Sequence, residues 1–516
     1  MPALLLDGRS LSLAALAPIL RGDPVELSLT DAARIAIQRA RDQVERHLRS
    51  GSVIYGLTTG FGRLKNVAIS PADLDQLQEN LVLSHCCGMG EPMPLPEVRA
   101  TQVLRLNALA RGHSGVRLEL CEQLARHFNK GFVPLVPQQG SVGASGDLAP
   151  LAHMAAAALG HGEAWLVRNG APARRMPARE ALRAIGEEPL RLSAKEGLAL
   201  VNGTEIMKAV GAGVCLRAAN LSKAADAIAA LSIEALLGSV KPFDARLADL
   251  KGQAGHARAA ANVRACMAHS QVLESHAGCD RVQDPYSLRC VPQVHGAFKA
   301  ALEHVTAILE AEMNSVTDNP ILFPDSDEVI SAGQFHGQPI SMALDYLALA
   351  LCTLANISER RVEQLVNPDL SHLPAFLTPQ PGLNSGLMLA QVAAASLASE
   401  SKTLAHPASV DTIPTSANQE DHVSMGLTAA RKARMICDNV EGVLAIELLC
   451  AAQAHEFHRD LRAGDGAHAA YELLRKRIPP LERDRWLYAD LAASRELLAS
   501  GALVAAVERA VGPLQP

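Results

Sequence analysis

The hydrophobic positions in the second half of the chain repeat with the period of long α-helices. Ile436, Val440, Leu444 and Leu448 follow one another at four-residue intervals, and Val443 widens the stripe that they form. This spacing places apolar side chains on one face of a helix, where they can pack against a neighbour. A long, core-facing helix is therefore predicted here.

Two further long helices are predicted in the same half of the chain. One covers residues 341–366 and ends at Asn367–Pro368, and the other covers 385–405 and is closed by His406–Pro407. Strand signals are few and short, so long helices dominate from about residue 205 onward.

Glycine and proline interrupt the first part of the chain. Loops are predicted over 51–62 (GSVIYGLTTGFG), 92–96 and 131–147. A helix is predicted directly after Asp147, whose side chain can cap it, and Pro150 fits its first turn, where a missing N–H costs little.

Composition favours a mainly α-helical fold. The 516 residues are 48% hydrophobic and 20% charged, which excludes a largely disordered chain. Aromatic residues are scarce, with 9 Phe, 2 Trp and 5 Tyr, and an Ala-rich, aromatic-poor core suits close-packed helices. We expect a loop-rich N-terminal region over 1–205, and a long-helix bundle with a C-terminal helical part over 206–516.

Charge and cysteine content exclude several classes of function. The net charge of −6 argues against a protein that binds nucleic-acid phosphates. The ten cysteines include no C-x-x-C pair, so we expect reduced thiols in a cytoplasmic protein. The apolar stretch Tyr346–Ile357 is shorter than the roughly 20 residues that cross a bilayer, and the start MPALLLDGRS lacks a basic region typical of signal peptides. We expect no membrane association.

The segment GSVGASGDLAPLAHM at 140–154 carries the sharpest chemical signal. Its glycine spacing fits neither a dinucleotide-binding loop nor a P-loop, although a non-catalytic, phosphate-cradling loop stays an alternative. The backbone itself offers other chemistry. Attack of the Gly146 nitrogen on the Ala144 carbonyl closes a five-membered ring, and loss of water, including the Ser145 hydroxyl, leaves a conjugated methylidene-imidazolone. Glycine suits the attacking position because it has no Cβ.

The flanks of this tripeptide resemble the aromatic amino acid ammonia-lyase family, and its histidine-acting members are the most similar. The resemblance runs along nearly the whole chain in ordered blocks: YGLTTGFG at 55–62, NLVLSH at 80–85, LALVNGT at 198–204, VQDPYSLRCVPQV at 282–294, NSVTDNP at 314–320, the stretch 384–426 ending in NQEDHVSMG, and VLAIE at 443–447. It implies a mainly α, fumarase/aspartase-like architecture.

The resemblance implies removal of ammonia and a β-proton from an amino acid. The electrophile would be 4-methylidene-imidazol-5-one (MIO), formed from Ala144, Ser145 and Gly146, with no dissociable cofactor. Tyr55 matches the residue that abstracts the β-proton, and because an unperturbed phenol near pKa 10 is a poor base, the site must stabilise its phenolate. Family members are homotetramers whose active sites draw residues from three subunits.

Several other residues match active-site positions of the family. Arg289 matches the residue that grips the substrate carboxylate, a task that suits the planar guanidinium. Tyr286, Asn202 and Gln283 match polar residues around the electrophile and the carboxylate, and Phe335 matches a lining position. A buried structural network for Gln283 and plain core packing for Phe335 are competing interpretations.

His85 and Glu420 decide the predicted substrate. Both can hydrogen-bond the ring nitrogens of histidine, whereas a phenyl ring would leave Glu420 unpaired at a cost of about 1–3 kcal/mol. His85 alone is ambiguous, because tyrosine-acting members also carry histidine there. The pair favours histidine as substrate and urocanate as product, with a tyrosine ammonia-lyase or a 2,3-aminomutase as the alternative.

Four positions depart from the family pattern. Thr58 and Gln334 stand where Asn is usual, and Cys86 and Cys87 stand where small residues such as Ala are usual. These cysteines adjoin the substrate-selecting histidine, so they could reshape the ring pocket.

No acidic–histidine cluster predicts a metal site. His455 and His458 have i, i+3 spacing, which differs from the H-E-x-x-H spacing of zinc proteases. They are predicted to lie on a solvated helix face.

Overall fold

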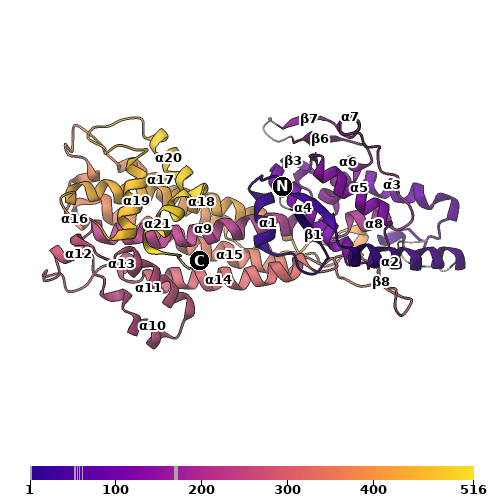
Figure 1. Cartoon of the computed structure of the whole chain (residues 1–516), viewed down its shortest axis with the longest axis horizontal. Coiled ribbons are helices and arrows are strands. Elements are labelled where there is room, and N and C mark those ends of the chain that lie inside the picture. The colour runs from indigo at the N-terminus through magenta and orange to yellow at the C-terminus, as the bar shows by residue number, and fades with distance from the viewer. Residues whose placement is uncertain (1–2, 52–53, 55, 57–58, 61, 168–172) are drawn as a thin grey trace. The chain divides into compact units, whose positions relative to one another are not determined.

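The computed structural model describes residues 3–51, 54, 56, 59–60, 62–167 and 173–516, and the fold is mainly α-helical, as predicted (Figure 1). Its contacts group the chain into two compact units of three stretches each. The first unit contains Met1–Gly213, Thr306–Asp345 and Pro407–Arg431, and the second contains Val214–Val305, Tyr346–His406 and Lys432–Pro516. Each unit combines stretches from distant parts of the chain, so this division does not test a boundary at 205/206. That boundary stays a prediction from the sequence pattern.

The strands of the first unit are only three or four residues long and form small sheets. Strand β1 (Ala3–Leu6) pairs in parallel with β2 (Glu26–Leu29), and β3 (Met89–Pro92) pairs antiparallel with β5 (Pro137–Gln139). A three-stranded antiparallel sheet has the order β4 (Phe132–Pro134), β6 (Glu163–Leu166), β7 (Arg174–Pro177). The fourth sheet is the antiparallel pair of β8 (Ile321–Phe323) and β9 (Glu328–Ile330).

Helices are the main regular structure of both units. Those of the first unit are α1 (Leu13–Leu20), α2 (Asp31–Ser50), α3 (Leu74–His85), α4 (Leu95–Ala110), α5 (Leu118–Asn129), α6 (Leu148–Ala158), α7 (Ala178–Ala184) and α8 (Glu196–Val201). Those of the second unit are α10 (Ala245–Lys251), α11 (Ala254–Cys266), α12 (Gln271–Ser275), α13 (Tyr286–Arg289), α16 (Pro368–Ser371), α17 (Met388–Leu404), α19 (Asp465–Arg475), α20 (Leu487–Ala499) and α21 (Ala502–Val511). Four long helices contribute residues to both units: α9 (Glu205–Ala235), α14 (Val291–Met313), α15 (Gln338–Val366) and α18 (Gly426–His455).

The long-helix predictions are confirmed. The apolar stripe lies in α18, and Ile436, Val440 and Leu444 are completely buried. Helix α15 ends one residue before Asn367, as predicted, although it begins at Gln338, three residues earlier than expected. The helix expected over 385–405 is α17.

The prediction of an uninterrupted loop over 131–147 is wrong. Strands β4 and β5 lie inside it. Each has three residues and contains a proline, so neither shows the alternation of apolar and polar residues by which a strand is recognised in a sequence. The partner strands β6 and β3 decide that these segments are extended.

Helix α15 is long and apolar enough to cross a membrane by length and composition alone, but 67% of its most apolar window is buried inside the protein. An apolar helix that is mostly buried is typical of a protein core.

The prediction of a solvated face for the two histidines at the end of α18 is wrong for His455. Its side chain is 3% exposed, and its ring meets the Tyr471 ring edge-on, with 5.0 Å between the centroids. Burial lowers the pKa of His455 to about 4. The neutral imidazole is therefore a core residue, and no group of three metal-binding side chains occurs among the described residues.

Within the first unit, α3, α6 and α8 pack against one another. Helix α6 is rich in buried alanines, among them Ala152, Ala155 and Ala156, whose small side chains let neighbouring helices approach closely. This packing brings the C-terminus of α3, the N-terminus of α6 and the C-terminus of α8 to one place, and the candidate site is built there.

Candidate active site

The tripeptide Ala144–Ser145–Gly146 lies in a tight turn of the first unit. Gly143 and Gly146 face each other across this turn, with φ of 75° and 73°. A Cβ added to Gly146 would lie 2.0 Å from the carbonyl oxygen of Gly203, which is a backbone atom and cannot step aside. Only glycine fits at the position of the predicted attacking nitrogen.

Hydrogen bonds tie this turn to two distant segments. The backbone N–H of Asp147 donates to the Gly203 carbonyl at 2.6 Å, and the N–H of Gly203 donates to the Ser145 carbonyl at 3.3 Å. From the other segment, the Ser424 hydroxyl donates to the Gly143 carbonyl at 3.2 Å. The turn is therefore fixed by groups that lie some 60 and 280 positions away in the sequence.

Asp147 does not cap α6, and this prediction is wrong. Its carboxylate instead accepts a hydrogen bond of 2.9 Å from the backbone N–H of Met207 in α9, while its other oxygen has no partner among the described residues. The side chain is completely buried, and burial raises the pKa of Asp147 to about 7, although the bond from Met207 opposes the shift. The carboxyl can therefore hold or release a proton near neutral pH, directly next to the tripeptide.

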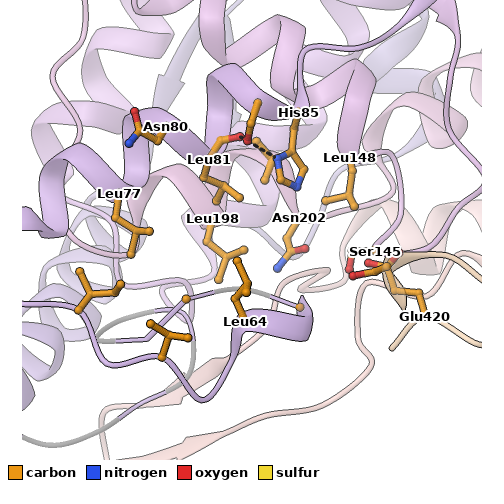
Figure 2. A pocket seen from close by; sticks show the side chains of 17 residues that line it. Leu64, Leu77, Asn80, Leu81, His85, Ser145, Leu148, Leu198, Asn202 and Glu420 are labelled. Carbon is orange, nitrogen blue, oxygen red and sulfur yellow. Dashed lines mark hydrogen bonds between the residues drawn. The ribbon is translucent and has the colours of Figure 1, made fainter. Parts of the chain in front are cut away.

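The packing of α3, α6 and α8 opens a pocket of about 470 Å³. His85 is the last residue of α3, Ser145 lies shortly before α6, and Asn202 directly follows α8. Figure 2 shows the ring of His85 directed into the pocket, with Leu148, Ser145 and Glu420 on one side of it and the other labelled leucines on the opposite side.

A second pocket of about 540 Å³ shares Ser145, Asn202 and Glu420 with the first one. Ala144 and Phe335 also line it. The two pockets are therefore parts of one site that surrounds the tripeptide, and the predicted residues His85, Ala144, Ser145, Asn202, Phe335 and Glu420 come together there.

His85 is a neutral hydrogen-bonding group in this site. Burial lowers its pKa, and the nearby Glu420 carboxylate opposes this shift. The Ser84 hydroxyl lies 3.1 Å from Nδ1 of the ring (Figure 2), which leaves Nε2 to face a ligand. A carboxylate and an imidazole thus reach one pocket from different elements.

Two hydrogen bonds fix the side-chain amide of Asn202. Its Nδ2 donates to the Asn319 carbonyl at 3.0 Å and to Oδ1 of Asp318 at 3.4 Å. Asp318 in turn forms a fully buried ion pair with Lys195, with 2.8 Å between Oδ2 and Nζ. Because both hydrogens of the side-chain amide are engaged, its oxygen Oδ1 is left as an acceptor for a ligand.

Gln283, Tyr286 and Arg289 line a separate pocket in the second unit, of about 480 Å³. The Arg289 guanidinium lies over the Tyr286 ring, 4.4 Å from its centroid, and its Nε donates to the Asp284 carbonyl at 2.9 Å. The Tyr286 side chain is 68% exposed. None of these three residues lines either pocket around Ser145.

The structure does not place every predicted residue in these pockets. Tyr55 and Thr58 are outside the described residues. Gln334, Cys86 and Cys87 are not among the residues that line the pockets, and burial raises the pKa of the half-buried Cys86 thiol to about 11. A protonated thiol is a weak nucleophile.

Sequence reasoning missed several residues that shape the site. The Thr415 hydroxyl donates a hydrogen bond to the Glu420 carboxylate. Asp318, which is paired with Lys195, accepts a hydrogen bond from the Asn202 amide. The polar block NSVTDNP contains Asp318 and could have indicated it, whereas nothing in the local sequence distinguishes Thr415 or Lys195. The apolar wall was also missed, and it consists of Leu64, Val67, Ile69, Leu77, Leu81, Leu148, Leu198 and Val201.

The comparisons with known proteins define the class. Residues 11–476 match the model of the aromatic amino acid lyase family, and the chain belongs to this family. The architecture is fumarase/aspartase-like, and family members use the MIO group in carbon–nitrogen bond cleavage.

Its relatives narrow this class. The chain is 51% identical over 510 residues to a histidine ammonia-lyase from Myxococcus xanthus, covering 99% of both chains. It is similar to the crystal structure of histidine ammonia-lyase from Trypanosoma cruzi, with a TM-score of 0.92, 41% identity, and coverage of 99% of this chain and 96% of that one. It also resembles a tyrosine aminomutase from Streptomyces globisporus, with a TM-score of 0.93, 35% identity and complete coverage of both chains.

Proposed function

We propose that the chain eliminates ammonia from L-histidine and releases trans-urocanate. One observation carries this proposal: His85 and Glu420, which can both hydrogen-bond an imidazole ring, line the same pocket as Ser145. The similarity to histidine ammonia-lyases over the full chain supports the same substrate.

The tripeptide turn fits an electrophile made from the backbone. Gly146 stands where no Cβ can be placed, so its nitrogen is sterically free to approach the Ala144 carbonyl. Asp147 follows Gly146 directly in the chain, and its unpartnered carboxylate oxygen can take up or give the proton that cyclisation moves. We infer that MIO forms from Ala144, Ser145 and Gly146 without a dissociable cofactor. This group supplies an electron-poor centre for the substrate amine.

The histidine ring would lie between the polar groups of the pocket. Glu420 accepts from a ring N–H, and His85 completes the polar surroundings of the ring. A phenyl or phenol ring offers no N–H, so the Glu420 carboxylate would lose its partner at a cost of about 1–3 kcal/mol. The apolar wall can pack against the faces of the ring and exclude water.

The remaining roles follow from chemistry and from the family match. We assign β-proton abstraction to Tyr55 and pairing with the substrate carboxylate to Arg289. Asn202 offers its side-chain Oδ1 to the substrate amine, and Phe335 lines the cavity. Tyr286 and Gln283 accompany Arg289 in its pocket.

Arg289 and Tyr286 suggest how the site is completed. They line a pocket that contains none of Ser145, His85 and Glu420. We therefore propose that a second copy of the chain contributes them, in a homotetramer with shared active sites. We place the enzyme in the cytoplasm, because all ten cysteines are free.

The decisive experiment is a substrate panel of L-histidine, L-tyrosine and L-phenylalanine with identification of each product. We expect urocanate, seen by its ultraviolet absorbance, and an intact mass that is two waters below that of the open chain. Coumarate from tyrosine and no urocanate would overturn the substrate, and a β-amino acid product would indicate an aminomutase. An unmodified mass of active enzyme would overturn the electrophile.

A further inference from the structure

The Glu420 carboxylate belongs to a turn that closes on itself. The backbone N–H of Thr415 donates to the Glu420 carbonyl at 2.9 Å, and the N–H of Glu420 donates to the Thr415 carbonyl at 3.3 Å. The Thr415 hydroxyl adds a third bond, to Oε2 of Glu420, at 2.6 Å. One residue therefore holds both the backbone and the side chain of Glu420.

Three successive residues between Thr415 and Glu420 have a left-handed backbone. Ser416, Ala417 and Asn418, which form the short helix η5 (Ser416–Asn418), have φ of 49°, 52° and 64°. Residues with a Cβ disfavour this region, and three in succession need support from their surroundings. The bonds between the ends of the turn supply it, and Lys65 Nζ holds the side chain of Gln419 at 2.7 Å. The direction of the carboxylate is thus set by the closed turn.

The hydroxyl bond distinguishes the two oxygens of Glu420. Oε2 is engaged by Thr415, whereas no described residue donates a hydrogen bond to Oε1. An O–H donor at about 2.5–2.7 Å from a carboxylate forms a strong, charge-assisted bond. Rotation of the carboxylate would break this bond, so Oε1 stays available to a ligand in the pocket that Glu420 lines.

We propose that Thr415 is a positioning residue for substrate selection. Its hydroxyl orients the Glu420 carboxylate so that one oxygen meets an N–H of a heteroaromatic ring. Thr415 itself lines neither pocket. The inference rests on the proposed histidine activity and deepens it, because it assigns part of the ring selectivity to a residue outside the pocket.

The test compares Thr415→Val with the unchanged enzyme. Valine keeps the β-branched shape and both backbone bonds, and removes only the hydroxyl. We expect KM for L-histidine to rise about tenfold, which corresponds to about 1.4 kcal/mol, while kcat changes less than threefold, because the orienting bond contributes to binding before reaction. Competitive inhibition by urocanate should weaken to a similar degree, and inhibition by cinnamate, whose ring has no N–H, should not change.

Two further variants separate positioning from a merely structural role. Thr415→Ser restores a hydroxyl and should return KM to within about threefold of the original. Thr412→Val removes a hydroxyl from the same segment, one that accepts from the Val423 N–H at 2.9 Å and has no hydrogen bond to Glu420 among the described residues. It should leave the ratio of urocanate to cinnamate inhibition unchanged.

The outcomes are distinct. An unchanged KM in Thr415→Val, or equal weakening of urocanate and cinnamate, would overturn the role of Thr415. If KM for L-histidine rises in Thr415→Val and Thr415→Ser does not restore it, the positioning role of Thr415 is overturned as well. Failure of the unchanged enzyme to make urocanate would instead overturn the proposed function, so the two failures cannot be confused.

Discussion

The two turns that line the pocket are held in opposite ways. In the turn over 140–147, the left-handed positions at 140, 143 and 146 are all glycine, and steric exclusion leaves no room for a side chain at Gly146. In the turn over 415–420, residues with a Cβ occupy the left-handed positions, and hydrogen bonds hold them there. In the proposed function the first turn forms the reactive group, whereas the second turn directs a carboxylate through a single side-chain hydrogen bond. We expect substitutions in the first turn to abolish turnover, and substitutions in the second turn to change the selectivity for the ring of the substrate.

The largest expected effect is that of Ser145→Ala. Removal of the hydroxyl prevents formation of the electrophile, and no ordinary side chain replaces it. Turnover of L-histidine should fall by roughly a thousandfold or more, within the range that enzymes gain over the uncatalysed reaction. Urocanate absorbance should show the loss of activity, and circular dichroism should show that the fold is unchanged. Retention of a tenth of the activity would contradict a decisive role of the first turn.

Glu420→Gln should have a smaller and selective effect. The amide keeps the shape of the carboxylate but loses its charge, and hydrogen bonds to charged groups contribute about 1.5–3 kcal/mol. kcat/KM for L-histidine should fall about 10- to 100-fold, while any activity on L-tyrosine falls less. Steady-state kinetics on both substrates checks this. Unchanged histidine kinetics would remove the main support for histidine as the substrate.

Asp147→Asn should change how stability depends on pH. Burial raises the pKa of Asp147 from its ordinary value of 3.8 to about 7, so the folded chain retains this proton when the unfolded chain has lost it. The stabilisation is fully present below about pH 4 and is lost as the pH rises through about 7. The asparagine variant has no carboxyl to titrate and does not lose this stabilisation. As the pH rises from about 4 to about 7, its free energy of unfolding should therefore increase relative to that of the parent.

This comparison is best made in the Ser145→Ala background, so that neither chain can mature. Urea unfolding at pH 4.5, 6 and 8 measures the difference. Parallel pH profiles of the two chains would contradict a raised pKa in the first turn.

The smallest expected effect is that of Ala417→Gly in the second turn. Relief of left-handed strain gains about 1–2 kcal/mol, and the extra freedom of glycine in the unfolded chain offsets about 0.5–1 kcal/mol of it. The free energy of unfolding should therefore rise slightly, by about 1 kcal/mol or less. Ala300→Gly, at an exposed position inside α14, is the control and should lower it by about 1 kcal/mol. Loss of stability in both variants would show that the turn at 415–420 carries little strain.

Local pattern predicted the helices well. The stripe of Ile436, Val440 and Leu444 specifies α18, because burial of one helix face depends on residues three and four positions apart. Strands β4 and β5 could not be predicted, because segments of three residues with a proline become extended only through their partners. The cap at Asp147 failed for a related reason: the N–H of Met207, 60 positions away, takes its carboxylate.

Patterns in the sequence were sufficient to predict the long helices and the glycine turn at 140–147, and its ordered blocks indicated the lyase family. Its motifs also named His85, Asn202 and Glu420, which line the pockets around Ser145, because each of the three lies in a block with its own motif. The folded structure was needed to show that His85, Ser145 and Glu420 share one pocket while Arg289 lines another. It also revealed that Thr415 holds the Glu420 carboxylate. Helix periodicity and turn composition are local properties of the chain, whereas the partner of a buried polar atom is chosen by packing among segments that are hundreds of residues apart.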